Sequence, residues 1–225
     1  KILIANRGEI AARIMRTCRR MGIQTVAVYS TADRKSPHVI LADQAICIGP
    51  PPSRQSYLDM DRIIQAAKDS GADAIHPGYG FLSENDLFAK AVREAGITFI
   101  GPSPESIHMM GNKLAAKKAA KDFNIPMVPG TDSAIADIKE AISIASTIGY
   151  PLLIKAAAGG GGKGMRIVHH ADELESQVER AMSEALASFG DGSVFIEKYV
   201  TSPRHIEIQV MADTHDHILY FFERE

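Results

Sequence analysis

The amino-acid sequence predicts an α/β fold in which helices cover both faces of a parallel sheet. Through the first hundred residues, short apolar runs alternate with segments in which apolar residues recur at helical spacing. The apolar runs have few polar interruptions, as in strands that are buried on both faces of a parallel sheet. Gly22, Gly71 and Gly96 end the helical segments, because glycine readily adopts the left-handed conformation that closes a helix. Together these observations predict a doubly wound sheet.

The expected strands of this sheet end in polar turns. We expect strands at residues 2–5, 25–30, 44–48, 74–76 and 98–100, and helices at residues 9–21, 57–70 and 84–95. Ligands of such sheets bind at the carboxyl ends of the strands, so we expect a cleft lined by the runs 6–8, 30–33, 76–80 and 101–103. Ser83 is the expected N-cap of the third helix. The run 6–8 has one glycine instead of the three in a dinucleotide fingerprint, which argues against a nicotinamide site.

A second group of helices and strands is expected after Pro104. Its expected helices are 105–110, 113–123, 137–147 and 171–186, with Asp172 a candidate N-cap, and its expected strands are 151–154, 165–168, 194–200, 204–211 and 218–222. The chain stops at Glu225, directly after an apolar strand, which leaves a sheet edge without a neighbour. We therefore expect this chain to be a fragment of a longer protein.

The composition is that of an ordinary globular protein. Of 225 residues, 45% are hydrophobic and 23% charged, and the net charge of −2 predicts neither a nucleic acid nor an anionic membrane as partner. No apolar run approaches the roughly 20 residues that cross a bilayer. Cys18 and Cys47 lack metal-binding or redox spacing, so we expect two buried thiols in a reducing compartment, the cytoplasm or, in a eukaryote, the mitochondrial matrix.

The run Lys155-Ala-Ala-Ala-Gly-Gly-Gly-Gly-Lys-Gly-Met165 is the most informative motif. Backbone without side chains can fold its N–H groups around phosphate oxygens, and the lysines at 155 and 163 can meet the same phosphates as point charges. A Walker A loop leads into a helix, whereas Gly164 is followed by an expected strand. Flexible linkers usually mix glycine with serine, so phosphate binding by a flap between two strands is favoured over a linker.

Other candidate contacts depend on their context. Glu197 or the carbonyl of Lys198 would accept a hydrogen bond from adenine, and the Val200 N–H would donate one, although an exposed Glu-Lys pair is more often a solvated face. Lys113 opens a helix, where the dipole disfavours a cation, so either an anionic ligand lies nearby or Lys113 is an ordinary surface lysine. His205 is more often a surface or supporting residue than a catalyst.

The combination of several runs resembles biotin carboxylase, the ATP-grasp component of the biotin-dependent carboxylases of acetyl-CoA, propionyl-CoA and pyruvate. The resemblance covers the whole chain and rests on residues 1–11, 74–85, 99–102, 110–113, the glycine loop, 195–199 and 203–210. It implies a Rossmann-like preATP-grasp domain at 1–111, a helical connector at 112–130, an ATP-grasp lid at 131–202, and the start of the C-terminal ATP-grasp lobe at 203–225.

The resemblance also implies a reaction. ATP and bicarbonate form carboxyphosphate, with ADP and phosphate as products, and the carboxyl group passes to N1 of biotin. Mg²⁺ or Mn²⁺ bridges the phosphate oxygens. The implied partners are a biotin carboxyl carrier domain, a carboxyltransferase, and a second copy of the chain that would meet Arg13 and Arg16.

The resemblance implies nucleotide-binding roles for particular residues. Lys113 and Lys155 would contact phosphates, Met165 would pack near adenine, and His205 would meet the ribose. The full implied set is Lys113, Lys155, Gly160, Gly161, Gly162, Lys163, Gly164, Met165, Glu197, Lys198, Tyr199, Val200 and His205. In the family, the residues for the metal, bicarbonate and biotin lie beyond the point where this chain ends. We therefore expect no catalytic or metal-binding residue within it, and no activity from it alone.

Two other kinds of function stay open. A carbamoyl-phosphate synthase-like or purine-pathway ATP-grasp ligase would share the lysines and the flap, although the runs 6–11 and 76–85 favour biotin carboxylase. A nucleotide-binding or assembly module without catalysis is the alternative from a different class.

Overall fold

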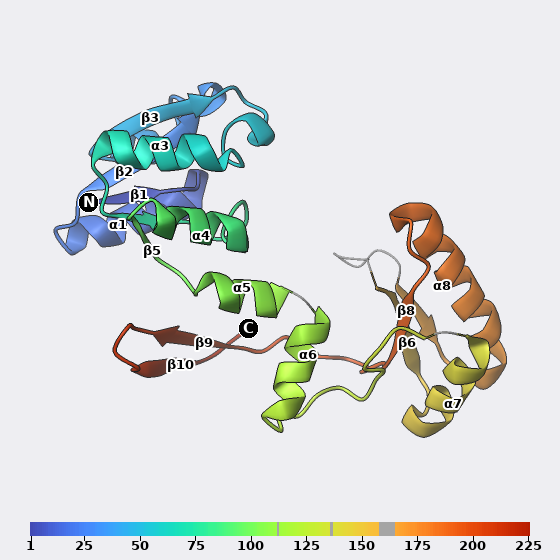
Figure 1. Cartoon of the computed structure of the whole chain (residues 1–225). Helices are drawn as coiled ribbons and strands as arrows, with labels where there is room; N and C mark the ends of the chain where they lie inside the picture. The colour runs from blue at the N-terminus through green and yellow to red at the C-terminus, as the bar shows by residue number, and fades with distance from the viewer. Residues whose placement is uncertain (112, 136, 158–164) are drawn as a thin grey trace. The chain divides into compact units, whose positions relative to one another are not determined.

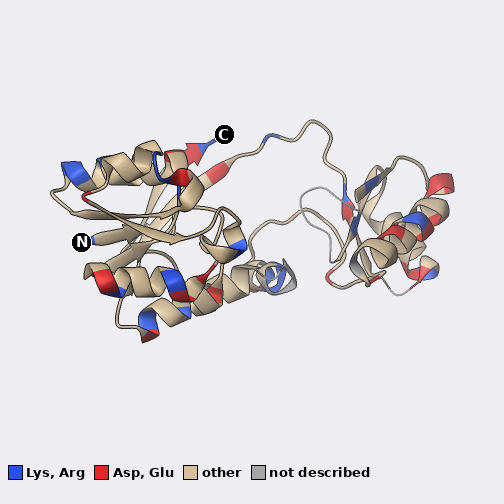
Figure 2. Ribbon diagram, turned by 90° about the horizontal axis from the view of Figure 1, so that it is seen from above, with Lys and Arg blue, Asp and Glu red and all other residues tan. Residues whose placement is uncertain are grey.

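The computed structural model describes residues 1–111, 113–135, 137–157 and 165–225. It divides into two compact units, Lys1–Lys117 and Lys118–Glu225, each with its own sheet and hydrophobic core (Figure 1). Acidic and basic residues lie mainly on the helices and loops, and the strands of the first unit carry few of them (Figure 2).

The first unit contains a five-stranded sheet in the order β3-β2-β1-β4-β5. Every pairing within it is parallel, and Ile4 at the centre lies opposite both Ala27 and His76. This order, with the first strand in the middle, is that of a doubly wound sheet, so the prediction for this part is confirmed. The strands are β1 (Ile2–Ile4), β2 (Thr25–Ser30), β3 (Gln44–Gly49), β4 (Ala74–His76) and β5 (Thr98–Phe99).

Helices cover both faces of this sheet because alternate strand residues point to opposite sides. Leu3, Val26 and Val28 face α3 (Met60–Ser70) and α4 (Asp86–Glu94). Ile4 and Ala27 face the other way and pack against α1 (Gly8–Arg20) and the end of α2 (Pro37–Leu41). Two short 3₁₀ turns, η1 (Thr31–Asp33) and η2 (Ser53–Gln55), and the helix α5 (Pro104–Gly111) complete the unit, and α6 (Lys113–Asp122) follows.

The second unit is built on an antiparallel sheet in the order β7-β6-β8. One face of this sheet buries Leu152, Ile154 and Ile196 against apolar side chains of α7 and α8. A separate hairpin follows, in which both strands are exposed. The elements are α7 (Ile138–Ile148), β6 (Leu152–Ala156), β7 (Met165–Val168), η3 (Ala171–Glu173), α8 (Leu174–Phe189), β8 (Val194–Lys198), β9 (Glu207–Ala212) and β10 (Ile218–Arg224).

Two predicted N-caps are wrong, and the helix expected at 57–70 begins only at Met60, after Asp59 as its N-cap. The N-cap of α4 is Asn85, whose side chain accepts the Phe88 N–H, and not Ser83. Asp172 lies inside η3, and α8 begins two residues later without a side-chain cap, so this prediction is also wrong. The five-residue helix α2 was not predicted, since its length gives too little periodicity to detect.

The two cysteines occupy different environments. Cys18 is buried on α1, where burial raises the pKa of its thiol, but Cys47 is exposed on the edge strand β3. The prediction of two buried thiols is therefore wrong for Cys47, because the sequence does not reveal which strand lies at the edge. Among the residues that the structure describes, no helix combines the length and apolar character needed to span a membrane.

Candidate functional site

The three-stranded sheet of the second unit has one face that α7 and α8 do not cover. Lys155 on β6 lies opposite Met165 on β7 and Phe195 on β8. Residues two apart on a strand share a face, so Glu197 lies on this face as well. The uncovered face of this sheet, defined by Lys155, Met165, Phe195 and Glu197, thus brings together three of the residues predicted to bind the nucleotide.

Lys155 and Glu197 form an ion pair on this uncovered face. The Lys155 ammonium donates a hydrogen bond to Glu197 Oε2, diagonally across β6 and β8. The Lys155 side chain is 36% exposed and that of Glu197 only 14% exposed, so the ammonium lies toward solvent and the carboxylate lies beneath it. A lysine held from below by a carboxylate can present its remaining N–H donors to an anion.

Lys198 is on the opposite face from this pair. It lies opposite Leu152 on the helix-covered side, and its ammonium donates to the carbonyls of Gly149 (3.1 Å) and Tyr150 (2.7 Å) at the end of α7. The Lys198 N–H donates to the Pro129 carbonyl (2.8 Å). The side chain of Lys198 therefore stabilises the fold. Its carbonyl is the remaining candidate acceptor for adenine.

The other predicted contacts are more dispersed. Tyr199 donates its N–H to the Pro151 carbonyl (3.0 Å), and Val200 is 47% exposed just beyond β8. His205 precedes β9 instead of lying within a strand, and its side chain, 81% exposed, pairs with Glu207 at 3.5 Å. Lys113 opens α6 as predicted, but its side chain lies outside what the structure describes. Gly160, Gly161, Gly162, Lys163 and Gly164 also lie outside the described residues.

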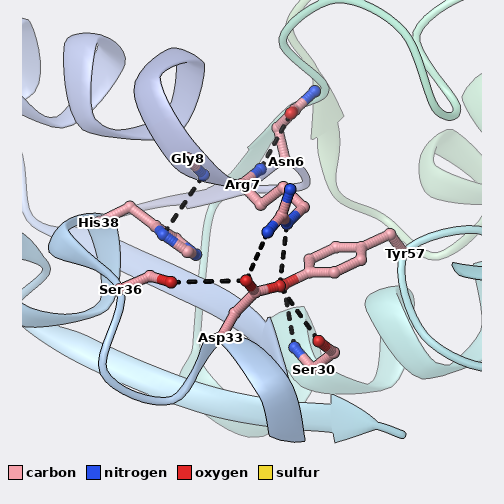
Figure 3. Close-up of polar contacts among 8 residues, drawn as sticks. All are labelled: Asn6, Arg7, Gly8, Ser30, Asp33, Ser36, His38 and Tyr57. Atoms are coloured by element: carbon pink, nitrogen blue, oxygen red, sulfur yellow. Dashed lines mark hydrogen bonds and ion pairs between the residues drawn. The ribbon is translucent and has the colours of Figure 1, made fainter. Parts of the chain in front are cut away.

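A buried polar network joins the ends of β1 and β2 in the first unit (Figure 3). Arg7 donates to both carboxylate oxygens of Asp33, from Nε at 2.8 Å and from Nη2. Asp33 also accepts hydrogen bonds from the Tyr57 hydroxyl (2.7 Å) and from the hydroxyls of Ser30 (3.1 Å) and Ser36 (3.4 Å). The sequence placed these strand ends at the cleft but did not predict the pairing, for which an arginine and an aspartate at neighbouring strand ends are the available signal.

The network keeps Asp33 ionised. The hydrogen bonds from Arg7 hold the pKa of the Asp33 carboxyl well below its usual range, and Asp33 in turn raises the pKa of Arg7. Burial, together with the hydrogen bond to Asp33, raises the pKa of Tyr57 to about 12. Dinucleotide-binding sheets use an acidic residue in this region to bind ribose. Here Arg7 already occupies that carboxylate, in agreement with the absence of a dinucleotide fingerprint.

The two arginines predicted to meet a second copy lie on the surface of α1. Arg13 and Arg16 line a shallow groove of about 600 Å³. Thr17, Arg19 and Arg20 complete it. Among the described residues, no group of three or more His, Cys, Asp or Glu side chains is arranged to hold a metal ion.

Comparison with known proteins decides the family. Residues 1–107 match the model of the biotin carboxylase N-terminal domain, and residues 112–225 match the model of the carbamoyl-phosphate synthase L chain ATP binding domain. A biotin carboxylase from Haemophilus influenzae is 55% identical over 226 residues, covering 100% of this chain and 50% of that protein. The chain belongs to the biotin carboxylase family.

Other relatives also match nearly the whole of this chain. The propionyl-CoA carboxylase alpha chain of Ruegeria pomeroyi is 53% identical over 225 residues, covering 100% of this chain and 33% of that protein. The biotin carboxylase–β,γ-ATP complex from Campylobacter jejuni superposes with a TM-score of 0.85 and 47% identity, covering 97% of this chain and 49% of that one. The chain thus spans about half the length of the biotin carboxylases that it matches.

A further biotin carboxylase structure contains ligands. The biotin carboxylase domain dimer of Hydrogenobacter thermophilus 2-oxoglutarate carboxylase, in complex with MgADP, ADP and bicarbonate, has a TM-score of 0.84 and 47% identity, covering 99% of this chain and 49% of that one. Nucleotide and magnesium are therefore bound by relatives that share this fold.

Proposed function

We propose that this chain forms the N-terminal, nucleotide-binding half of a biotin carboxylase. In this function ATP and bicarbonate yield carboxyphosphate and ADP, and the carboxyl group passes to biotin on a carrier domain, with release of phosphate. The observation that carries the proposal is the Lys155–Glu197 pair on the uncovered face of the β7-β6-β8 sheet, in a chain that biotin carboxylases match along its whole length.

In this proposal the uncovered face binds ATP. Lys155 contacts the phosphates as a point charge, with Lys113 and the glycine loop, including Lys163, as further contacts. Met165 packs against the adenine ring. The strand end after Glu197 reads the adenine edge through the Lys198 carbonyl and the Val200 N–H, beside Tyr199, and His205 meets the ribose. The exposure of Val200 and of Met165, which is 46% exposed, is consistent with these contacts.

In this proposal the metal ion binds together with the nucleotide. This chain itself offers the nucleotide lysines and main-chain groups, and Mg²⁺ or Mn²⁺ would bind beside the phosphates of ATP. When bound, the metal offsets phosphate charge. The work of this chain is to orient the nucleotide and to stabilise phosphate charge by fixed donors.

The proposed organisation follows the family. We propose a preATP-grasp domain at 1–111, a connector at 112–130, a lid at 131–202 and the start of the C-terminal lobe at 203–225. The proposed partners are a biotin carboxyl carrier domain, a carboxyltransferase and a second copy of the chain at Arg13 and Arg16. The proposed compartment is the cytoplasm, or the mitochondrial matrix in a eukaryote.

Transfer of labelled carbon tests the function. The polypeptide, extended to the length of its relatives, is incubated with MgATP, labelled bicarbonate and free biotin, and acid-labile carboxybiotin is measured. ATP-dependent labelling of biotin supports the proposal. With ammonia supplied in place of biotin, ATP-dependent labelling of a carbamate by a protein that does not label biotin would instead support a carbamoyl-phosphate synthase-like ligase. This is the second candidate, and its ATP binding domain is the one that the family model for residues 112–225 describes.

A further inference from the structure

Asn6 joins the two loops at the centre of the parallel sheet. Its side-chain Nδ2 donates to the Pro77 carbonyl and to the Tyr79 carbonyl, both at 2.8 Å, and its Oδ1 accepts the Arg7 N–H at 2.9 Å. Asn6 is 1% exposed. Its amide therefore uses both N–H donors to hold the loop after β4 against the end of β1, at the point between these strands where open α/β sheets bind ligands.

The loop held by Asn6, residues 77–81, contains three residues with positive φ angles. Gly78 and Gly80 both have φ of 68°, and Phe81 has φ of 45°, a conformation that costs free energy for a residue with a side chain. A Cβ on Gly78 would lie 2.7 Å from Asn6 Nδ2 and 2.8 Å from Ile10. Loop and asparagine thus fit each other closely.

Two further contacts fix the ends of the loop. His76 accepts the Gly78 N–H on Nδ1 at 3.0 Å, and the Phe81 ring stacks on Tyr57 with ring centres 5.2 Å apart. Tyr57 is itself held by Asp33. The side chain left free by these contacts is that of Tyr79, which is 63% exposed. These contacts therefore fix the backbone of loop 77–81, from which the Tyr79 side chain projects into solvent.

We propose that Asn6 is a positioning residue, which acts on the reaction by fixing loop 77–81 and with it the placement of Tyr79. This inference rests on the proposed function. The loop contains no cation, so it does not suit bicarbonate or the phosphates of ATP, and apart from Lys113 the proposed ATP contacts belong to the second unit. An aromatic ring with one hydroxyl suits an uncharged ring system, which among the proposed substrates is biotin.

The test compares matched variants of the extended polypeptide. Asn6→Asp keeps the shape of the side chain and removes both donors to the loop. Gly78→Ala disturbs the same contact from the loop side, because the added Cβ would press against the Asn6 amide. Gly71→Ala is the control for Gly78→Ala, because Gly71 has a similar φ of 63° and an added Cβ there meets nothing within 4 Å. We expect Asn6→Asp and Gly78→Ala to raise the KM for biotin about tenfold and to leave the KM for ATP unchanged. Gly71→Ala should leave both unchanged.

A double variant separates positioning from general damage. If Asn6 acts through Tyr79, then Asn6→Asp should have little further effect on the KM for biotin in a Tyr79→Ala background. An equal rise in both KM values, or additive effects of the two substitutions, would overturn the proposal.

Hydrogen exchange in the 225-residue chain gives a readout that does not require catalysis. We expect Asn6→Asp to speed exchange of the amides of loop 77–81 and not those of α3. Unchanged exchange would overturn the positioning role even in a protein without carboxylase activity. Conversely, loss of protection in a protein that never labels biotin would mean that the proposed function, and not the loop contact, is wrong.

Discussion

Lys155 and Glu197 are paired diagonally across β6 and β8, with the lysine more exposed than the glutamate. Lys198, the next residue on β8, points to the other face and is bound to the end of α7. The alternation of a strand thus assigns one lysine to a candidate ligand face and the other to the fold.

Lys155→Met should weaken ATP and ADP binding. A charge-assisted contact to phosphate contributes about 1.5–3 kcal/mol, so the Kd should rise by roughly ten- to a hundredfold. Titration calorimetry of the extended polypeptide measures this. An unchanged Kd would remove Lys155 from the proposed phosphate site.

Lys198→Met should lower the stability of the second unit and leave ATP binding nearly unchanged. Its ammonium donates to two carbonyls within the second unit, so its loss should lower the free energy of unfolding by about 1–3 kcal/mol. The Kd for ATP should change by less than about twofold, because the group proposed to read adenine is the main-chain carbonyl. Urea denaturation and calorimetry on the same variant check both statements, and a large rise in Kd with unchanged stability would contradict them.

Arg7→Met should destabilise the first unit. It removes two hydrogen bonds from the buried Asp33 carboxylate, which keeps its bonds from Tyr57 and Ser30. Because Arg7 is half exposed, the expected loss is roughly 2 kcal/mol, below the about 3–5 kcal/mol of a fully buried pair. Lys90→Met is the control, since the exposed Lys90–Glu94 pair should contribute less than about 1 kcal/mol. Equal effects of both substitutions in urea denaturation would show that the network contributes no special stability.

Mild acid should destabilise the first unit through two histidines. Burial lowers the pKa of both His38 and His76, and each accepts a glycine N–H on Nδ1, so the folded state holds them neutral. The unfolded chain takes up these protons near pH 6.5, and stability is therefore present above that pH and lost as the pH falls below it.

The loss should approach about 1.4 kcal/mol per pH unit for each histidine. His38→Gln should reduce the slope of unfolding free energy between pH 7 and about 5.5, relative to the unsubstituted chain. Urea denaturation at several pH values measures both slopes, and identical slopes for the variant and the unsubstituted chain would contradict the assignment.

The sequence predicted what depends on local pattern. Alternating strands and helices predicted the parallel sheet, and the residues on either side of the glycine run predicted a strand that contains Lys155 and a strand that begins at Met165. The Arg7–Asp33 pair was not predicted, because 26 residues separate its members and only the parallel pairing of β1 with β2 brings them together. The opposite directions of Lys155 and Lys198 likewise required the register of β6 against β8.

Boundaries and exposure were the least predictable features. Asn85 caps α4 because Ser83 lies in the turn that leads into the helix, where the Ser83 N–H is bound to the Gly80 carbonyl. Cys47 is exposed because β3 lies at the edge, a position that no property of its own sequence specifies.

The most direct test of the central claim is ADP release by the extended polypeptide with MgATP and bicarbonate, with and without free biotin. We predict that biotin stimulates release, and that Lys155→Met lowers the stimulated rate. Release that ignores biotin and responds to another acceptor would contradict the assignment to biotin carboxylation, while leaving the Lys155–Glu197 face as a nucleotide site to be tested by binding.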